Sequence, residues 1–468
     1  MKPNERLVET VIEINPSNRD ILSGPIYVVL ISGVAALGGL LFGYDTAVIS
    51  GAIGLLQSHF SLTAVGTGWA ASSALAGCVL GAIVAGLGGD RLGRHKLLLI
   101  SAVCFLVSAL GTAVASTFTV FILFRIMGGV GIGAASVASP LYIAESSPAR
   151  WRGRLVALNQ LAIVFGMLII YAVNYWIHSL GTLEWNQNTG WRWMFASGIA
   201  PSALLLGLLF FVPETARFLL MRGRRREAER VAFRMGDETL KEILDAEQKS
   251  TSTNRSPLRT VMTIGISLAV LQQITGINVF LYYAPVIFSR ISHSGNASLL
   301  ETIFVGAVNV LFTIVAMAIV DKAGRKPLLM IGCLGMALTL TGMGVAVLHE
   351  SSSAWLLSFV LGYIACFALS VGPVTWIVLS EIFPEHFRST AMAISTAALW
   401  IANFAVSQSF PMLEENRTLV KYFGHSAPFF LYASFCVVEI WFVWRNLPET
   451  KNRSLEEIST WWRGSGFR

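Results

Sequence analysis

Two charged residues of opposite sign stand in stretches of the chain that are otherwise apolar. Asp45 is the only charged residue between Ile26 and Leu56, and Arg125 lies in an apolar segment that continues with glycines. A charged side chain at the centre of a bilayer costs about 2.5–3.5 kcal/mol on insertion scales, so such a residue is a candidate functional group when it has a partner. We expect Asp45 and Arg125 to form a buried ion pair.

Opposing effects would make the Asp45 carboxyl sensitive to the position of Arg125. Burial favours the neutral carboxyl, whereas a nearby guanidinium favours the carboxylate. Asp45 should therefore take up a proton when Arg125 moves away and release it when Arg125 approaches, which links protonation to a change of shape. The alternative is a static pair that fixes how the two helices pack.

A second acid, Glu439, lies in another apolar segment, about two turns from the end of that segment. It could be a further proton site. The simpler interpretation is a polar group that is satisfied near the membrane surface, so the predicted proton-coupling pair contains only Asp45 and Arg125.

Three amides, Gln272, Gln273 and Asn278, fall within seven residues of one apolar segment. An amide both donates and accepts hydrogen bonds, so this set suits a neutral ligand that is covered with hydroxyl groups. Gly276 and Pro285 favour local unwinding of the same segment, as in the broken helices that line carrier sites. Alternatively, the amides hold neighbouring helices together.

The composition indicates a chain that lies in a membrane. Hydrophobic residues make up 54% and charged residues only 13% of the 468 residues, with a mean hydropathy of +0.64. A soluble protein carries about 25% charged residues. Apolar runs of spanning length predict an all-α membrane protein of twelve transmembrane helices in two pseudo-symmetric six-helix halves. The predicted spans are 26–50, 65–88, 96–116, 118–142, 155–177, 192–212, 259–289, 300–320, 327–348, 354–380, 389–411 and 426–446.

The same features argue against several other classes of protein. The net charge of +7 does not indicate nucleic-acid binding, because the basic residues stand at the ends of apolar runs. The chain has no phosphate-cradling G-x-x-x-x-G-K-[ST] loop, and its cysteines and histidines lack metal-ligand spacing. We therefore predict no enzyme activity, no cofactor and no metal site.

Basic residues also predict the orientation of the chain. The loops after the even-numbered spans are rich in Lys and Arg, whereas the loops after the odd-numbered spans hold few. Basic loops stay in the cytoplasm, so both termini should be cytoplasmic.

Three short motifs recur in the second half of the chain at nearly one spacing. The D-x-x-G-R of 90–94 returns 231 residues later, the E-x-x-P-x-x-x-R from Glu145 returns 236 residues later, and the P-E-T of 213–215 returns 235 residues later. A duplication explains this order. The predicted divisions are a cytoplasmic N-terminal segment 1–25, a six-helix half 26–212, a cytoplasmic helical linker 213–258, a second half 259–446 and a cytoplasmic tail 447–468.

These repeated motifs carry both signs of charge at the predicted cytoplasmic surface. We expect facing charges of the two halves to hold that side shut, although plain anchoring of the loops by Arg and Lys is the alternative. The predicted cytoplasmic gate consists of Asp90, Arg91, Arg94, Glu145, Arg152, Glu214, Arg217, Asp321, Arg325, Glu381, Arg388 and Glu449.

The motifs resemble those of a known family along nearly the whole chain. DRLGRHK, DKAGRK, PLYIAESSPARWRGR, PETARFLL, QQITGINVFLYYAP, GPVTWIVLSEIFPEHFR and LPETK look like the sugar porter family of the major facilitator superfamily. FGYDTAVISG resembles the bacterial sugar–proton symporters of that family, and the family pattern also pairs the positions of Asp45 and Arg125.

The resemblance implies import of a monosaccharide or related polyol, coupled to inward proton flow by alternating access. An uncoupled sugar uniporter and a non-transporting sugar sensor are the alternatives. The implied partners are a sugar, the proton and the lipid bilayer, and the implied state is a single chain in a bacterial inner membrane. The implied sugar-binding residues are Gln160, Gln272, Gln273, Asn278, Asn309, Trp376, Phe42, Tyr282 and Trp400.

Two positions depart from the pattern of a related bacterial symporter. Leu399 and Met167 each stand where that symporter has a glutamine. Both changes remove a partner for a sugar hydroxyl and enlarge the apolar wall, so the substrate could present fewer hydroxyls there or a different ring.

Overall fold

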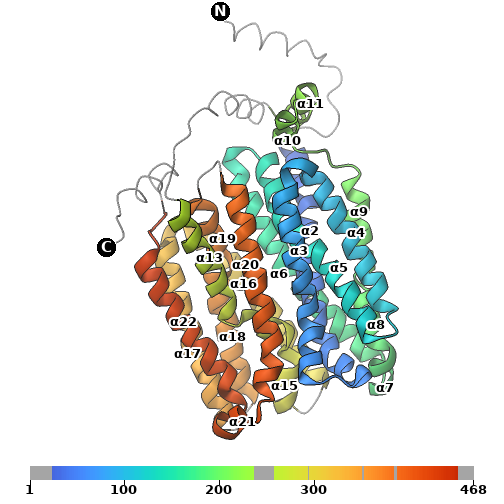
Figure 1. The fold of residues 1–468 in the computed structure, drawn as a ribbon, viewed down its shortest axis with the longest axis vertical. Helices are drawn as coiled ribbons and strands as arrows, with labels where there is room; N and C mark the ends of the chain where they lie inside the picture. Colours follow the sequence, from blue (N-terminus) through green and yellow to red (C-terminus); the bar gives the residue numbers. More distant parts are fainter. Residues whose placement is uncertain (1–23, 237–257, 293–294, 350–352, 384–386, 452–468) are drawn as a thin grey trace, which may run out of the picture.

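The computed structural model describes residues 24–236, 258–292, 295–349, 353–383 and 387–451. Helices account for nearly all of these residues, and no strand occurs among them. Eleven helices in this part of the chain are long and apolar enough to cross a membrane. Figure 1 shows them as one upright bundle. The small helices α10 and α11 lie at its upper end, and we call this end of the bundle the linker end.

The first half of the bundle holds six of the predicted spans. Its helices are α2 (Pro25–Phe60), α3 (Ala64–Leu92), α4 (Arg94–Ala113), α5 (Phe118–Ser146), α6 (Ala149–Leu180), α7 (Leu183–Trp185), the π-turn Asn186–Gly190, α8 (Trp191–Ala196) and α9 (Ile199–Leu209). The sixth span is the composite Leu183–Leu209. Most predicted limits hold within a few residues. However, α2 continues ten residues beyond the predicted end at residue 50, α6 begins six residues before the predicted start at 155, and the sixth span begins nine residues before the predicted start at 192.

The second half holds the other spans. Its helices are α13 (Leu258–Ile274), α14 (Ile277–Tyr282), α15 (Ala284–Ser292), α16 (Gly295–Ala323), α17 (Arg325–Leu348), α18 (Ser353–Leu369), α19 (Val371–Ile382), α20 (Arg388–Glu414), α21 (Arg417–Phe423), the 3₁₀ turn Gly424–Ser426 and α22 (Ala427–Asn446). Two predicted spans are each broken into shorter helices.

The seventh span is broken at Gly276. This residue has φ 91°, a left-handed conformation that glycine adopts without strain, and it separates α13 from α14. A second interruption at Tyr283 precedes α15. The unwinding that Gly276 suggested is thus confirmed, and it explains why no single helix of the seventh span is long enough to cross a membrane.

Glycines bring α3 and α5 into direct backbone contact. A Cβ atom on Gly129 would lie 1.8 Å from the Ala74 carbonyl oxygen, and one on Gly77 would lie 2.0 Å from the Ile126 carbonyl oxygen. Small residues at helix interfaces allow this approach, which supports association inside a bilayer.

We expect Gly129→Ala to prevent normal packing of the first half, because the new methyl group meets backbone atoms that cannot rotate away. The purified variant should lose its monodisperse elution peak or unfold at a clearly lower temperature. Gly54→Ala is the matched control, since nothing lies within 4 Å of a Cβ atom at that helical glycine. Equal stability of the two variants would contradict this account of the α3–α5 contact.

The two halves meet along two helix pairs. α3 packs along α20, the pair at the centre of Figure 1, and α6 packs against α16. At the end opposite the linker, Ser72 donates to Gln408 Oε1 at 2.8 Å, and Gln408 Nε2 donates to the Val65 carbonyl at 3.2 Å. Another contact between the halves joins Tyr171 to the Leu281 carbonyl at 2.8 Å, so α6 holds the backbone of the broken span.

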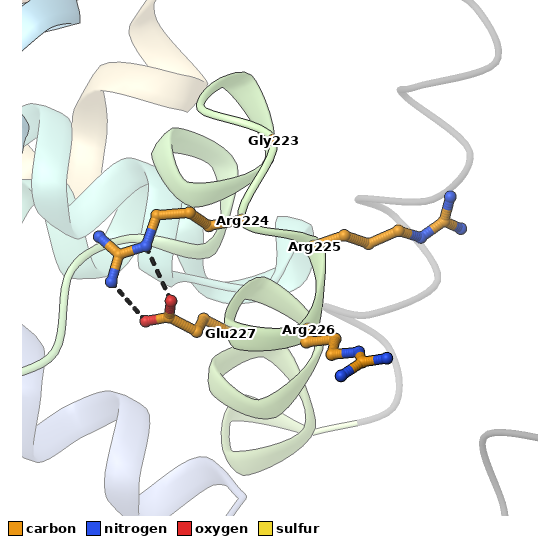
Figure 2. Close-up of a pocket in the computed structure, with 5 residues that line it drawn as sticks. All are labelled: Gly223, Arg224, Arg225, Arg226 and Glu227. Carbon is orange, nitrogen blue, oxygen red and sulfur yellow. Dashed lines mark hydrogen bonds and ion pairs between the residues drawn. The ribbon is translucent and has the colours of Figure 1, made fainter.

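The linker contains two short helices, α10 (Ala216–Met221) and α11 (Arg225–Met235). Their apolar sides pack together through Ala216, Leu219, Ala228 and Ala232, so the described part of the linker is helical as predicted; residues 237–257 of the linker lie outside the described part. Residues 223–227 line a surface concavity here, and Figure 2 shows that Arg224 pairs with Glu227 while the side chains of Arg225 and Arg226 point away from this pair. This concavity contains none of the predicted site residues.

Candidate functional site

The two buried charges of the first half form the predicted ion pair. Nη1 of Arg125 on α5 lies 3.1 Å from Oδ2 of Asp45 on α2 and also donates to the Asp45 carbonyl at 3.1 Å. The side chains are 1% and 14% exposed, respectively. Only one guanidinium nitrogen holds the carboxylate, and Nε of Arg125 is buried with no hydrogen-bond partner in the described residues. The pair is therefore close but not the bidentate arrangement that holds a carboxylate most firmly.

Packing positions this ion pair. The Arg125 guanidinium lies 5.5 Å from the centre of the Phe195 ring on α8. Gly128, one turn after Arg125, leaves room for the acid, since a Cβ atom there would be 3.0 Å from Asp45 Oδ2 and 2.4 Å from Ser108 Oγ. The glycines after Arg125 thus allow α2, α4 and α5 to meet around the carboxyl.

The predicted amides surround the break in the seventh span. Gln272 donates through Nε2 to the carbonyls of Val371 at 3.0 Å and Gly372 at 3.2 Å. Gln273 donates to Gln272 Oε1 at 3.3 Å, and Asn278 donates to Gln273 Oε1 at 2.5 Å. All three amides are less than 9% exposed. The amide row therefore crosses the break and ties it to the start of α19.

The amides of this row have two different roles: one joins helices, and the other two keep donors for a ligand. Gln272 holds the backbone of α19, which fits the interpretation that amides join helices. Gln273 and Asn278 bond only to amides of their own row in the described contacts. Each terminal NH₂ can donate twice, so these two residues retain donors for a ligand.

Aromatic residues from both halves contact one another across the bundle. The rings of Phe42 on α2 and Trp400 on α20 lie 5.4 Å apart and are tilted by 59°. Trp400 Nε1 is buried without a hydrogen-bond partner in the described residues. Tyr282 on α14 is 2% exposed and lies beside Asn403 of α20. Asn403 was not predicted, although an amide in the apolar run 389–411 was a possible signal.

The remaining predicted sugar contacts are placed as follows. Gln160 on α6 and Trp376 on α19 are half-buried, and Asn309 on α16 is 4% exposed. Leu399 and Met167, the two apolar departures, are 3% and 6% exposed. Asn159, next to Gln160, was also missed: its Oδ1 atom is buried without a partner in the described part of the chain and faces Gly39 of α2.

Charged groups form a compact network at the linker end of the first half. Arg94 lies at the start of α4 and binds Glu145 through Nη2 at 3.0 Å and Nε at 3.1 Å. Thr215 donates to the other oxygen of Glu145 at 2.6 Å. Glu214 accepts the backbone N–H groups of Arg94 at 3.1 Å and His95 at 3.2 Å, so a carboxylate occupies the N-terminus of α4.

The second half repeats this network residue by residue. Arg325 binds Glu381 at 3.0 Å, Thr450 donates to Glu381 at 2.5 Å, and Glu449 accepts the N–H groups of Arg325 and Lys326, each at 3.0 Å. The turn glycines correspond too, with φ 92° at Gly93 and 89° at Gly324. The duplication inferred from the motifs thus extends to individual contacts.

The described contacts show which partners several predicted gate residues have. Each described ion pair of these residues joins two residues of one half, so these pairs brace the halves internally. Arg152 donates to the Ala144 and Ser147 carbonyls, the Arg91 carbonyl accepts from Arg222, and exposed Arg217 has no ion pair with a described residue. The side chains of Asp90, Asp321 and Arg388 lie outside the described residues.

The two networks differ in how deeply their ion pairs are buried, so their contributions to stability can be compared. Arg94 and Glu145 are each 4% exposed, whereas Arg325 and Glu381 are 11% and 24% exposed. Removing one partner of a buried pair costs roughly 3–5 kcal/mol, and less where solvent screens the charges. Because glutamine keeps one hydrogen bond, Glu145→Gln should lose less than this, but it should still lower the unfolding temperature more than Glu381→Gln does. An equal or reversed order in thermal unfolding would contradict the assignment of the tighter network to the first half.

The interpretation of Glu439 as a satisfied polar group is wrong. Its side chain is 0% exposed, and the described residues offer its two carboxyl oxygens only the thiol of Cys333, a weak hydrogen-bond donor. The sequence could not show this, because the packing of α22 against α17, rather than distance along the helix, decides what surrounds the acid.

Fold and site together define a membrane carrier of two six-helix halves, with a buried ion pair in one half and an amide-lined broken helix in the other. The chain belongs to the sugar transporter family, since the model described as "Sugar (and other) transporter" matches residues 31–462. The fold is that of the major facilitator superfamily.

Individual relatives cover almost the same length. The chain is 42% identical to the D-xylose-proton symporter of Escherichia coli over 93% of this chain and 96% of that protein. It is 38% identical to the glucose facilitated diffusion protein of Zymomonas mobilis over 92% and 96%. A solved structure of the E. coli xylose transporter in a partially occluded inward-open conformation superposes with a TM-score of 0.82, at 40% identity, over 92% of this chain and 99% of that one.

Proposed function

We propose that this protein imports a monosaccharide or related polyol together with protons by alternating access. The observation that carries the proposal is the buried Asp45–Arg125 pair, held by one guanidinium nitrogen at 3.1 Å. A relative named as a proton symporter supports coupling, whereas the relative named for facilitated diffusion keeps the uniporter as the second candidate.

The pair provides the proton switch. When Arg125 lies close, it favours the carboxylate of Asp45, and when it withdraws, burial favours the protonated acid. Protonation removes the attraction that draws α2 toward α5, so the proton and the packing of these helices depend on each other. Arg125 reaches the Asp45 carboxylate through a single nitrogen, so a small displacement is enough to break that contact.

The sugar binds between the halves, on the amide row and the aromatic residues. Gln273 and Asn278 bind sugar hydroxyls, as do Gln160 and Asn309, while Phe42, Tyr282, Trp376 and Trp400 cover the apolar faces of the ring. Gln272 has a supporting role because its amide already binds α19. Leu399 and Met167 form an apolar part of the wall, which favours a substrate with few hydroxyls on that side.

The carrier works as a single chain in a bacterial inner membrane, with the linker end and both termini in the cytoplasm. The basic loops at the linker end support this orientation. In this proposal the halves 26–212 and 259–446 rock against each other, and the linker 213–258 and the two terminal segments lie in the cytoplasm. The charge networks of Arg94 and Arg325 keep the helices of each half together while the halves move.

Labelled-sugar uptake into proteoliposomes tests the proposal. With an inward proton gradient, wild-type protein should concentrate the sugar inside, and a protonophore should abolish the accumulation while leaving equilibration intact. Equilibration that never exceeds the outside concentration, with or without the gradient, would instead support the uniporter.

A further inference from the structure

Glu439 is a buried acid that the Asp45–Arg125 pair does not account for. It lies on α22 and is 0% exposed, and the only hydrogen-bonding group beside its carboxyl in the described residues is the weakly polar thiol of Cys333. Asp45 is 14% exposed and has a guanidinium beside it. Asp45 and Glu439 are therefore in opposite situations: Asp45 has a positive partner, and Glu439 has none in the described residues.

The groups around Glu439 are weakly polar. Cys333 of α17 lies beside the carboxyl, Cys436 precedes it by one turn on α22, and Tyr363 of α18 and Tyr432 of α22 complete the titratable groups nearby. Among the described side chains of α13, α17 and α20, no lysine, arginine or histidine faces it. Lys326 donates to the Trp444 carbonyl, and Arg445 is exposed at the end of the helix.

An ionised carboxylate in these surroundings would have neither a counter-ion nor enough hydrogen bonds. Such a group avoids the cost of burial by binding a proton. A protonated carboxyl is neutral, and its O–H can point to the Cys333 sulfur, which is a weak acceptor. The surroundings of Glu439 thus fit the acid and not the carboxylate.

The acid also lies on the helix that supports the break in the seventh span. Tyr432, Cys436 and Glu439 follow one another at four and three residues, so they share one face of α22. The Tyr432 ring covers Gly276, where a Cβ atom would be 2.6 Å from it, and Tyr363 donates to the Thr275 carbonyl at 3.0 Å. This face therefore contacts the backbone that must move if the broken helix bends.

We propose that Glu439 is a second proton-binding site, protonated in this conformation, which exchanges its proton with the cytoplasm when α13 separates from α22. Glu439 precedes the last residue of α22, Asn446, by seven positions, about 10 Å along the helix, so the linker end is the near surface. α13 packs on α22 and begins at the same end. The exchange step rests on the proposed transport cycle, whereas the protonated state does not.

Infrared spectroscopy of the purified protein tests the protonated state. A protonated carboxyl has a carbonyl stretch that a carboxylate lacks. Near neutral pH, Glu439→Gln should remove one component of this band, and Asp45→Asn should leave that component in place. A Glu439→Gln spectrum with every wild-type component would show that Glu439 is ionised and would overturn the proposal.

Cys333→Ser provides a second test that keeps the acid. The hydroxyl of serine is a stronger hydrogen-bond donor and acceptor than a thiol. If Glu439 is protonated, its band should move to lower frequency in this variant, which decides the matter even if Glu439→Gln does not fold. A band that stays at the wild-type frequency in Cys333→Ser counts against a protonated Glu439 beside that sulfur.

Deuterium exchange tests the link to transport. After transfer into D₂O, the Glu439 band should shift slowly in resting protein and several-fold faster once a sugar is present that the wild type exchanges across proteoliposomes. An exchange rate that the sugar leaves unchanged would overturn the coupling of Glu439 to the cycle. If no candidate sugar is exchanged at all, the proposed function fails, and the band alone still decides the protonated state.

Discussion

Asp45→Asn should abolish uphill accumulation of sugar while preserving exchange of sugar down its gradient. Asparagine has nearly the shape of aspartate but cannot bind a proton and carry it in the same way, so the variant loses the group that Arg125 controls at 3.1 Å. Arg125 can still donate to the backbone carbonyl of residue 45, which should keep the helices packed. The measurement is labelled-sugar uptake with an imposed proton gradient, followed by counterflow without one.

Glu301→Gln is the matched control for this variant. Glu301 is an acid in the span α16, and no ion pair joins it to another described residue. Its neutralisation should leave accumulation unchanged. Normal accumulation by Asp45→Asn would mean that the Asp45–Arg125 pair is a static support for helix packing.

Gln273→Ala should weaken sugar binding itself. The change removes a residue that accepts from Asn278 at 2.5 Å and donates to Gln272, and it leaves buried amides without partners. An unsatisfied buried polar group costs about 1–3 kcal/mol, which corresponds to a Kd that is weaker by roughly five- to 150-fold. Equilibrium binding of the transported sugar to purified protein measures this effect.

Gln57→Ala controls for the loss of an amide far from the row, near the end of α2, and it should leave the Kd unchanged. A Gln273→Ala variant that unfolds at lower temperature but binds sugar with the wild-type Kd would assign Gln273 to helix packing alone. The two properties are measured on the same preparation, so the roles can be separated.

The sequence predicted the helices well because length and apolarity determine spans in a bilayer. It predicted the break at Gly276, where a glycine marks the position. It missed the break between α18 and α19 at Ser370. Pro373 explains this second break, because its ring would collide with the Leu369 carbonyl if one helix continued.

The site was predicted unevenly for physical reasons. A lone acid and a lone arginine in apolar runs have few possible partners, so the Asp45–Arg125 pair followed directly. The gate charges have many possible partners, and the turn at Gly93 decides among them by presenting the Arg94 backbone to Glu214 within one half. The surroundings of Glu439 depend on which face of α22 meets α17, which one sequence does not show.

Sugar-dependent proton movement is the most direct test of the central claim. Wild-type protein in lightly buffered proteoliposomes should make the external medium more alkaline when glucose, xylose, galactose or myo-inositol is added, for at least one of these compounds. Such a pH change identifies the substrate and shows symport together. Exchange of a labelled sugar with no pH change would contradict the account, because Asp45 would then be a structural charge in a uniporter.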